Sequence, residues 1–122
     1  MSDYIYFKSR DELLRLDTST IVYFEAQGNY TKIVLASGFE GFVCMNLGKM
    51  QERISVRLQD KAKKFLRVGK SYIINTGYLL QVTPLRQLLV LSDQRTFRYD
   101  LSVSKDALRK FMDMVVESKS NK

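Results

Sequence analysis

Basic side chains gather around one short aromatic and β-branched segment in the middle of the chain. Five of them fall within residues 61–70, and they are Lys61, Lys63, Lys64, Arg67 and Lys70. Lysine and arginine are the side chains that bind phosphate groups, lysine as a compact cation and arginine through a planar fork. The cluster could therefore hold a polyanion, although runs of charge are more often a solvated surface.

The positive charge lies almost entirely in the second half of the chain. The formal net charge of the protein is +7. Residues 1–60 hold seven Lys and Arg against eight Asp and Glu, whereas residues 61–122 hold thirteen against five. A one-sided positive field attracts polyanions and speeds encounter with them. This distribution favours a nucleic-acid partner over a basic surface that merely keeps the protein soluble.

Composition argues against several catalytic and metal-binding classes. The chain has no histidine and one cysteine, so a zinc site or a Ser/His or Cys/His nucleophile pair cannot be assembled. The nucleotide-binding motifs G-x-x-x-x-G-K-[ST] and G-x-G-x-x-G do not occur. Carboxylates are scattered singly, and no spacing points to acid–base catalysis. We therefore expect no enzymatic activity, no catalytic residue, no metal site and no cofactor.

The same features predict a cytoplasmic protein of one domain. A single cysteine, Cys44, suits a reducing compartment, and we expect its side chain to be a small buried hydrophobe. Met1–Arg10 does not resemble a signal peptide, and no segment is long and apolar enough to cross a membrane. A chain of 122 residues can bury its own core. We expect one domain over residues 1–117 and a disordered tail over residues 118–122.

Most of the expected elements are short strands. β-branched, aromatic or alternating segments separated by compact turns predict an all-β arrangement, in which consecutive strands pair antiparallel and the first five form a meander. Gly69 interrupts two of the later strands, which indicates a bulge or a close backbone approach. The strands expected are Tyr4–Lys8, Glu12–Leu16, Thr20–Glu25, Tyr30–Ala36, Phe39–Cys44, Phe65–Val68, Ser71–Ile74, Leu88–Leu91 and Phe97–Val103.

Two longer segments have helical spacing instead. The first runs from Asn46, an expected N-cap, to Leu58, and the second follows Ser104, also an expected cap. We expect a single helical turn over Gly77–Leu80 and a tight turn at Asp93-Gln94. The apolar residues expected on one face are Leu47, Met50, Ile54 and Leu58 in the first helix, and Leu108, Phe111, Met112 and Val115 in the second.

Three blocks, taken in order, resemble the LytTR family of DNA-binding domains. Phe65–Asn75 reads F-L-R-V-G-K-S-Y-I-I-N, which is similar to the family signature of Arg, His, Arg or Asn, Ser, Tyr, Ile, Val and Asn. Residues 21–31 read I-V-Y-F-E-A-Q-G-N-Y-T, and residues 101–105 read L-S-V-S-K. The resemblance extends roughly from Ile5 to Met112.

The resemblance implies a mainly β fold, with elongated antiparallel sheets of short strands, one mid-chain helix and one C-terminal helix. It implies a bacterial transcriptional regulator whose strand-end loops enter successive major grooves of double-stranded DNA and read sequence. Self-association on repeated half-sites is a further expectation, whereas a membrane partner is not expected. The positions implied to contact DNA are Asn29, Thr31, Lys32, Lys63, Lys64, Arg67, Gly69, Lys70, Ser71, Ser104 and Lys105.

Individual residues have competing interpretations. The family usually has histidine at the position of Gly69, so this chain departs from its relatives there. Thr31 and Lys32 are equally compatible with groove contact and with a structural role, and Ser104 is fully explained as a cap. Asn75 is expected to hold the turn that follows it. We expect Tyr30 and Tyr72 to pack against neighbouring strands and not to stack on bases.

Two other functions remain open at this stage. A basic β module could bind RNA or single-stranded DNA, which would require an exposed aromatic platform. Alternatively, the chain could be a protein-interaction domain that modulates a DNA-binding relative.

Overall fold

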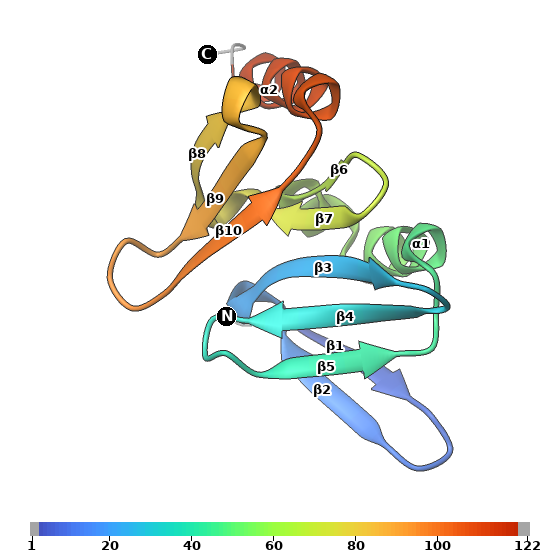
Figure 1. The fold of residues 1–122 in the computed structure, drawn as a ribbon. Coiled ribbons are helices and arrows are strands. Elements are labelled where there is room, and N and C mark those ends of the chain that lie inside the picture. The colour runs from blue at the N-terminus through green and yellow to red at the C-terminus, as the bar shows by residue number, and fades with distance from the viewer. Residues whose placement is uncertain (1–2, 120–122) are drawn as a thin grey trace. The chain divides into compact units, whose positions relative to one another are not determined.

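The computed structural model describes residues 3–119, which form ten strands and two α-helices (Figure 1). The chain divides into two compact units, unit 1 over Met1–Gly77 and unit 2 over Tyr78–Lys122, and each is described by itself. The fold is mainly β with antiparallel sheets. The elements are β1 Tyr4–Lys8, β2 Leu13–Asp17, β3 Ile21–Gln27, β4 Tyr30–Leu35, β5 Glu40–Val43, α1 Leu47–Leu58, β6 Phe65–Val68, β7 Tyr72–Asn75, β8 Leu79–Thr83, β9 Leu88–Ser92, β10 Arg98–Ser102 and α2 Lys105–Lys119.

Unit 1 contains a hairpin and a larger sheet. β1 and β2 pair only with each other, from Tyr4↔Asp17 to Lys8↔Leu13. The larger sheet has the strand order β5-β4-β3-β7-β6, so β3 lies between β4 and β7. The expected meander over the first five strands is therefore wrong. A 3₁₀ turn over Thr18–Thr20 separates β2 from β3, and β3 takes a distant strand, β7, as its second partner.

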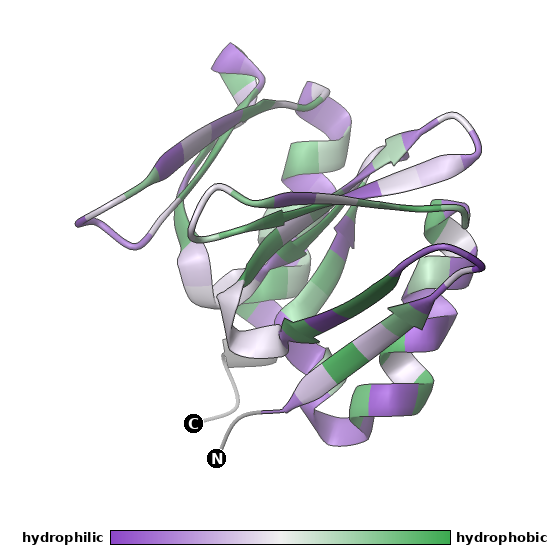
Figure 2. Cartoon of the chain, turned by 90° about the horizontal axis from the view of Figure 1, so that it is seen from below, coloured by the Kyte–Doolittle hydropathy of each residue, from purple (hydrophilic) through white to green (hydrophobic). Residues whose placement is uncertain are grey.

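The core of unit 1 lies between the larger sheet, the β1–β2 hairpin and α1. Phe24 of β3 and Ile73 of β7 are buried in it together with the apolar face of α1. Burying side chains of this size contributes about 1.5–3 kcal/mol each. Figure 2 shows hydrophobic and hydrophilic residues alternating along the helices, as expected when one helix face is apolar. The four buried residues of α1 are those predicted, Leu47, Met50, Ile54 and Leu58.

Both predicted helix caps are present. The Asn46 side-chain oxygen accepts a hydrogen bond from the Lys49 amide at 2.8 Å. The Ser104 hydroxyl accepts from the Ala107 amide at 3.3 Å, while its carbonyl accepts from the Leu108 amide at 3.0 Å. The two side-chain bonds each satisfy a backbone donor that has no partner within the helix, and the Ser104 carbonyl accepts the first bond of α2 itself. The two helices therefore begin where the sequence predicted.

Unit 2 consists of a three-stranded sheet, in the order β10-β9-β8, and α2. The expected helical turn over Gly77–Leu80 is partly wrong. A 3₁₀ turn covers Thr76–Tyr78, and the chain then enters β8, a strand that the sequence pattern missed. β10 alternates as predicted, with Leu101 buried and Arg98 exposed.

The core face of α2 is partly as expected, and the C-terminal tail stays a prediction. Leu108 and Phe111 of α2 are buried as expected, but Met112 is 39% exposed, so its assignment to the core face is wrong. The tail expected over residues 118–122 falls largely outside the described residues, and α2 itself reaches Lys119. The tail and the single domain over residues 1–117 stay predictions.

The β9–β10 connection is longer than the expected two-residue turn, and Asp93 organises it. One carboxylate oxygen of Asp93 accepts from the amides of Arg95, Thr96 and Phe97 at 2.9, 2.7 and 3.1 Å. The other oxygen accepts from the Thr96 hydroxyl at 2.5 Å. These bonds, that of the Thr96 side chain first, hold the pKa of Asp93 far below its usual range.

We expect Asp93→Ala to reduce stability at neutral pH and to matter less in acid. The pKa of Asp93 is lower in the folded state than in the unfolded state. The Asp93 carboxylate therefore stabilises the fold fully only at a pH above the pKa that this carboxyl has in the unfolded chain. That stabilisation is lost as pH falls from about 4 towards the folded value. Thermal unfolding of wild type and variant at about pH 7, 4 and 3 checks this. The difference in melting temperature should shrink with pH, and a constant difference would refute the role of the carboxylate.

Candidate nucleic-acid interface

Two hairpin turns and the start of α1 lie at the same edge of the larger sheet in unit 1 (Figure 1). β3 is antiparallel to both β4 and β7, so the end of β3 lies beside the start of β7, at Glu25↔Tyr72. The Ala26 amide also donates to the Ser71 carbonyl at 2.8 Å. We call this the turn edge. It comprises residues 28–29 of the β3–β4 turn, 69–71 of the β6–β7 turn and 44–46 of the β5–α1 connection.

The β3–β4 turn is a tight connection of two residues. The pair Gln27↔Tyr30 closes it, leaving Gly28 and Asn29 as the central positions. Gly28 has a φ of +61°, which glycine adopts without steric cost and which matches the twist of a two-residue hairpin. Asn29 is exposed. The sequence signal Gly-Asn therefore places an amide side chain at the tip of the hairpin.

The β6–β7 turn is built over Gly69, Lys70 and Ser71. Val68↔Tyr72 closes it, and Gly69 has a φ of +61°. Gly69 is therefore a turn residue, so the bulge that was one of its two expected roles is absent, and the close backbone approach stays a prediction. A side chain in this conformation would be strained, so the turn suits glycine. Lys70 and Ser71 are exposed at the tip.

Arg67 braces this turn from within β6. Its Nε donates to the Gly69 carbonyl at 3.3 Å, and one terminal nitrogen donates to the Lys70 carbonyl at 3.2 Å. The other terminal nitrogen donates to Gln51 Oε1 of α1 at 3.3 Å. The planar guanidinium is suited to such forked bonding, whereas a lysine ammonium is not. Arg67 thus holds the backbone that presents Lys70, and three of its donors are engaged within the protein.

Thr31 and Lys32 have partners inside unit 1. Thr31 is fully buried, and its hydroxyl donates to the Met45 carbonyl at 2.7 Å. Lys32 Nζ lies 3.2 Å from Glu25 and 3.9 Å from Glu40, with the Lys32 side chain 17% exposed. In this arrangement Thr31 ties β4 to the β5–α1 connection and Lys32 is neutralised by two carboxylates. Both side chains therefore have structural partners within unit 1, and their contact with a DNA groove stays a prediction.

The basic run lies away from the turn edge. Lys63 and Lys64 belong to a 3₁₀ segment, Gln59–Lys64, which precedes β6, whereas Lys70 follows it. Four strand residues at about 3.3 Å each separate the two groups by about 13 Å. The five basic residues of positions 61–70 therefore do not lie together at one turn.

The members of the basic run also differ in their contacts. Lys61 is paired with Asp3 at 2.7 Å, and Lys64 lies 5.3 Å from the ring centre of Phe65. Lys63 is exposed. Lys63 is therefore the member of the run whose charge is most accessible to a polyanion.

Two of the implied contact residues lie in unit 2. Ser104 caps α2 through the bonds described above, and Lys105 is the first residue of the helix. Both are exposed. The N-terminus of a helix carries partial positive charge and free backbone donors, so this segment suits an anion. Asp106 in the same turn offsets part of that charge.

Several expectations about single residues can now be settled. Asn75 is 3% exposed, donates to the Ile21 carbonyl at 2.8 Å and accepts from the Gly77 amide at 2.9 Å, so its structural role is confirmed. Tyr72 packs edge-on against Tyr23, with ring centres 5.9 Å apart. Burial and the nearby Glu25 raise the pKa of Tyr72. Tyr30, by contrast, is 50% exposed, which does not fit the expected packing.

The sequence analysis misjudged Cys44 at the turn edge and did not consider two residues of α1 near it. Cys44 is exposed, so its assignment as a buried hydrophobe is wrong. Gln51, which bonds to Arg67, and Lys49, in the first turn of α1, were not considered as site residues. The Asn46 cap was the signal that could have placed them, because it fixes which end of α1 faces the turns.

Across residues 3–119 no group of three His, Cys, Asp or Glu side chains is arranged to hold a metal ion. Neither described helix has an apolar stretch of the length needed to span a bilayer. The turn edge therefore offers backbone amides, an amide side chain, a hydroxyl and a lysine, which are groups for binding and positioning.

Comparisons with known proteins identify similar domains. The family model described as LytTr DNA-binding domain matches residues 11–115. A solved structure, the LytTr DNA-binding domain of a putative methyl-accepting/DNA response regulator from Bacillus cereus, is similar with a TM-score of 0.64 at 20% identity. The match covers 92% of this chain and 95% of that chain, and at this identity it concerns the fold. The comparison with curated proteins finds no match.

Proposed function

Because this chain belongs to the LytTR family of DNA-binding domains, we propose that it recognises particular sequences of double-stranded DNA and thereby regulates transcription. The observation that carries the proposal is the turn edge, where the β3–β4 and β6–β7 turns project from neighbouring strands. Base edges in the major groove are read by hydrogen-bonding side chains on a narrow projecting element. Both turns have this form.

The contact residues that we propose divide into readers and supports. Asn29, Lys70 and Ser71 are exposed at the turn tips and are placed to reach base edges or phosphates. Gly69 allows the backbone to approach DNA closely because it has no side chain. Arg67 acts through the turn that it braces.

The remaining implied contacts receive lesser roles. Thr31 and Lys32 hold the sheet that carries the turns. Lys63 and Lys64 neutralise phosphates without reading sequence, since a lysine near the backbone carries little base information. In unit 2, Ser104 and Lys105 present a helix N-terminus to a phosphate.

The wider setting follows from this role. A protein that acts by binding and positioning needs no catalytic group, and we propose that it works in the cytoplasm on duplex DNA. Self-association on repeated half-sites would increase affinity through effective concentration, without requiring any new contact to the bases. Both statements rest on the proposed DNA binding.

One observation favours the alternative that the protein binds RNA or single-stranded DNA. Tyr30 and Phe42 are 50% and 48% exposed, and they lie on adjacent strands of the larger sheet. Exposed aromatic rings can stack on unpaired bases. However, Lys32 and its carboxylate partners lie beside Phe42 in the sheet register, so the two rings do not make a continuous apolar platform.

A salt titration distinguishes binding of duplex DNA from binding of a single strand. We expect affinity for duplex DNA to fall steeply as salt rises, because each phosphate contact releases counterions. For about five contacts the slope of log affinity against log salt should be roughly −4 to −5. Fluorescence anisotropy with a duplex and with one of its strands measures this. A flat response, or tighter binding of the single strand, would reject the duplex proposal, and binding to neither would favour a protein-interaction domain.

A further inference from the structure

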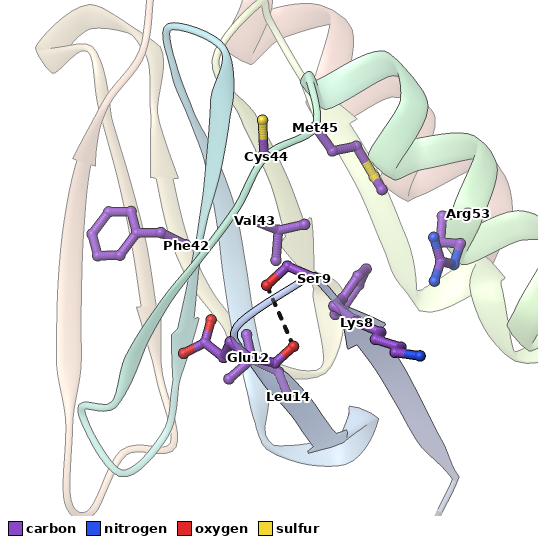
Figure 3. A pocket seen from close by; sticks show the side chains of 10 residues that line it. Lys8, Ser9, Glu12, Leu14, Phe42, Val43, Cys44, Met45 and Arg53 are labelled. Atoms are coloured by element: carbon purple, nitrogen blue, oxygen red, sulfur yellow. Dashed lines mark hydrogen bonds between the residues drawn. The ribbon is translucent and has the colours of Figure 1, made fainter.

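A pocket in unit 1 is not used by the proposed function. It lies between the β1–β2 hairpin, β5 and α1, and it has a volume of about 190 Å³ (Figure 3). An apolar cavity of about 150 Å³ accepts a benzene molecule. The pocket therefore has room for a molecule with one ring.

The apolar lining of the pocket is fixed by the core. Phe7 and Leu14 are 4% and 9% exposed and belong to the core cluster of unit 1, and Val43 and Met45 pack against that cluster. Phe42 at the margin is 48% exposed. A hydrophobic molecule placed here would replace water against side chains that are already held in position, so little ordering would be required.

Two cations lie on one side of this pocket. Figure 3 shows the Lys8 ammonium and the Arg53 guanidinium on the same side, and the Glu12 carboxylate pointing away from both. Arg53 is held in place because one of its terminal nitrogens donates to the Tyr6 carbonyl at 3.0 Å. Its guanidinium carbon also lies 5.3 Å from the ring centre of Phe7.

The cations retain donors for a ligand. A guanidinium has five N–H donors, and in Arg53 the hydrogen bond to the Tyr6 carbonyl engages one terminal nitrogen. Within residues 3–119, no ion pair involves Lys8 or Arg53. A fixed arginine beside a lysine, next to an apolar wall, is an arrangement that pairs with a carboxylate.

We propose that this pocket binds a small organic carboxylate with one aromatic ring. The ring lies against Phe7, Leu14 and Val43, and the carboxylate accepts hydrogen bonds from Arg53 and Lys8. This site goes beyond the proposed function, since its occupation needs no DNA and is measured without it.

Benzoate and benzamide test the proposal as a matched pair of probes. They have nearly the same shape and differ in charge. Amide-detected NMR titration of the whole chain should show saturable shifts at Leu14 and Val43 with benzoate. Because hydrogen bonds to charged groups contribute more than neutral ones, benzoate should bind about 10-fold more tightly than benzamide.

Three variants test whether the affinity for benzoate depends on the charges of Arg53 and Lys8. Arg53→Met keeps the length of the side chain and removes its charge, and it should weaken benzoate about 10-fold while weakening benzamide much less. Lys8→Met is a second variant at an exposed position, so the test survives if Arg53→Met fails to fold. Arg57→Met, one turn further along α1 and outside the pocket, should change neither affinity.

Three results would overturn the proposal. One is the absence of saturable shifts at the pocket with benzoate. Another is equal binding of benzoate and benzamide, and the third is equal loss of benzoate affinity in Arg57→Met and in the two pocket variants. None of these outcomes depends on DNA, so a failure here leaves the proposed function to its own test.

Discussion

Replacing Lys70 by alanine should weaken binding to the preferred duplex by about 1–3 kcal/mol if its ammonium reaches a base edge. The turn that carries Lys70 is closed by Val68↔Tyr72 and braced by Arg67, so the lysine projects from a fixed backbone. Removing it should therefore delete a defined contact and leave the fold intact. Affinity for random duplexes should fall less, because they offer only phosphates.

Lys63→Ala provides the matched control. Lys63 is exposed, but it lies before β6 and so at the other end of that strand from Lys70. Its loss should weaken all duplexes about equally and reduce the salt slope by roughly one. Anisotropy titrations with the preferred and a random duplex measure both variants. If Lys70→Ala also weakens both duplexes equally, Lys70 is a phosphate contact and base reading must be sought at Asn29 or Ser71.

Replacing Asn75 by alanine should lower the free energy of unfolding by about 1–3 kcal/mol. The Asn75 side chain is buried and serves two backbone groups at once, the Ile21 carbonyl and the Gly77 amide. Alanine would leave the carbonyl without this donor in the interior, and a polar group buried without a partner is costly. Thermal and denaturant unfolding measure the loss.

Asn29→Ala makes the same chemical change at an exposed position. Asn29 lies at the tip of the β3–β4 turn, so its replacement should alter stability far less and weaken binding of the preferred duplex. Opposite effects of two identical substitutions would separate the structural asparagine from the proposed reader. If Asn75→Ala unfolds at the wild-type temperature, the account of the buried amide is wrong.

Local sequence signals predicted much of the fold. β1 and β6 have the predicted bounds, and Asn46 and Ser104 cap helices as expected, because strand alternation and capping depend on neighbouring residues. β8 was missed because its burial is only partial and its identity as a strand depends on pairing with β9. Met112 lies at helical spacing from the buried residues of α2, but spacing alone does not determine how much of the helix surface is buried.

The candidate site was predictable in outline and not in detail. The family resemblance pointed to the β6–β7 turn, and Gly-Asn pointed to the β3–β4 turn. The predicted strand Phe65–Val68 already placed Lys63 and Lys70 at its two ends. The order of residues could not show that Lys32 meets Glu25, because that contact depends on the register of β3 and β4. Nor could it show that Arg67 bends back to the turn carbonyls, because that depends on the conformation of its side chain.

Selection of bound duplexes from a random library tests sequence-specific recognition most directly. The whole chain is used for selection, and the recovered duplex is then compared by anisotropy with a shuffled duplex of the same composition at physiological salt. We predict that one motif recurs and that its duplex binds about 10³-fold or more tightly than the shuffled one. Recovery of no motif, with equal affinity for the two duplexes, would contradict the account.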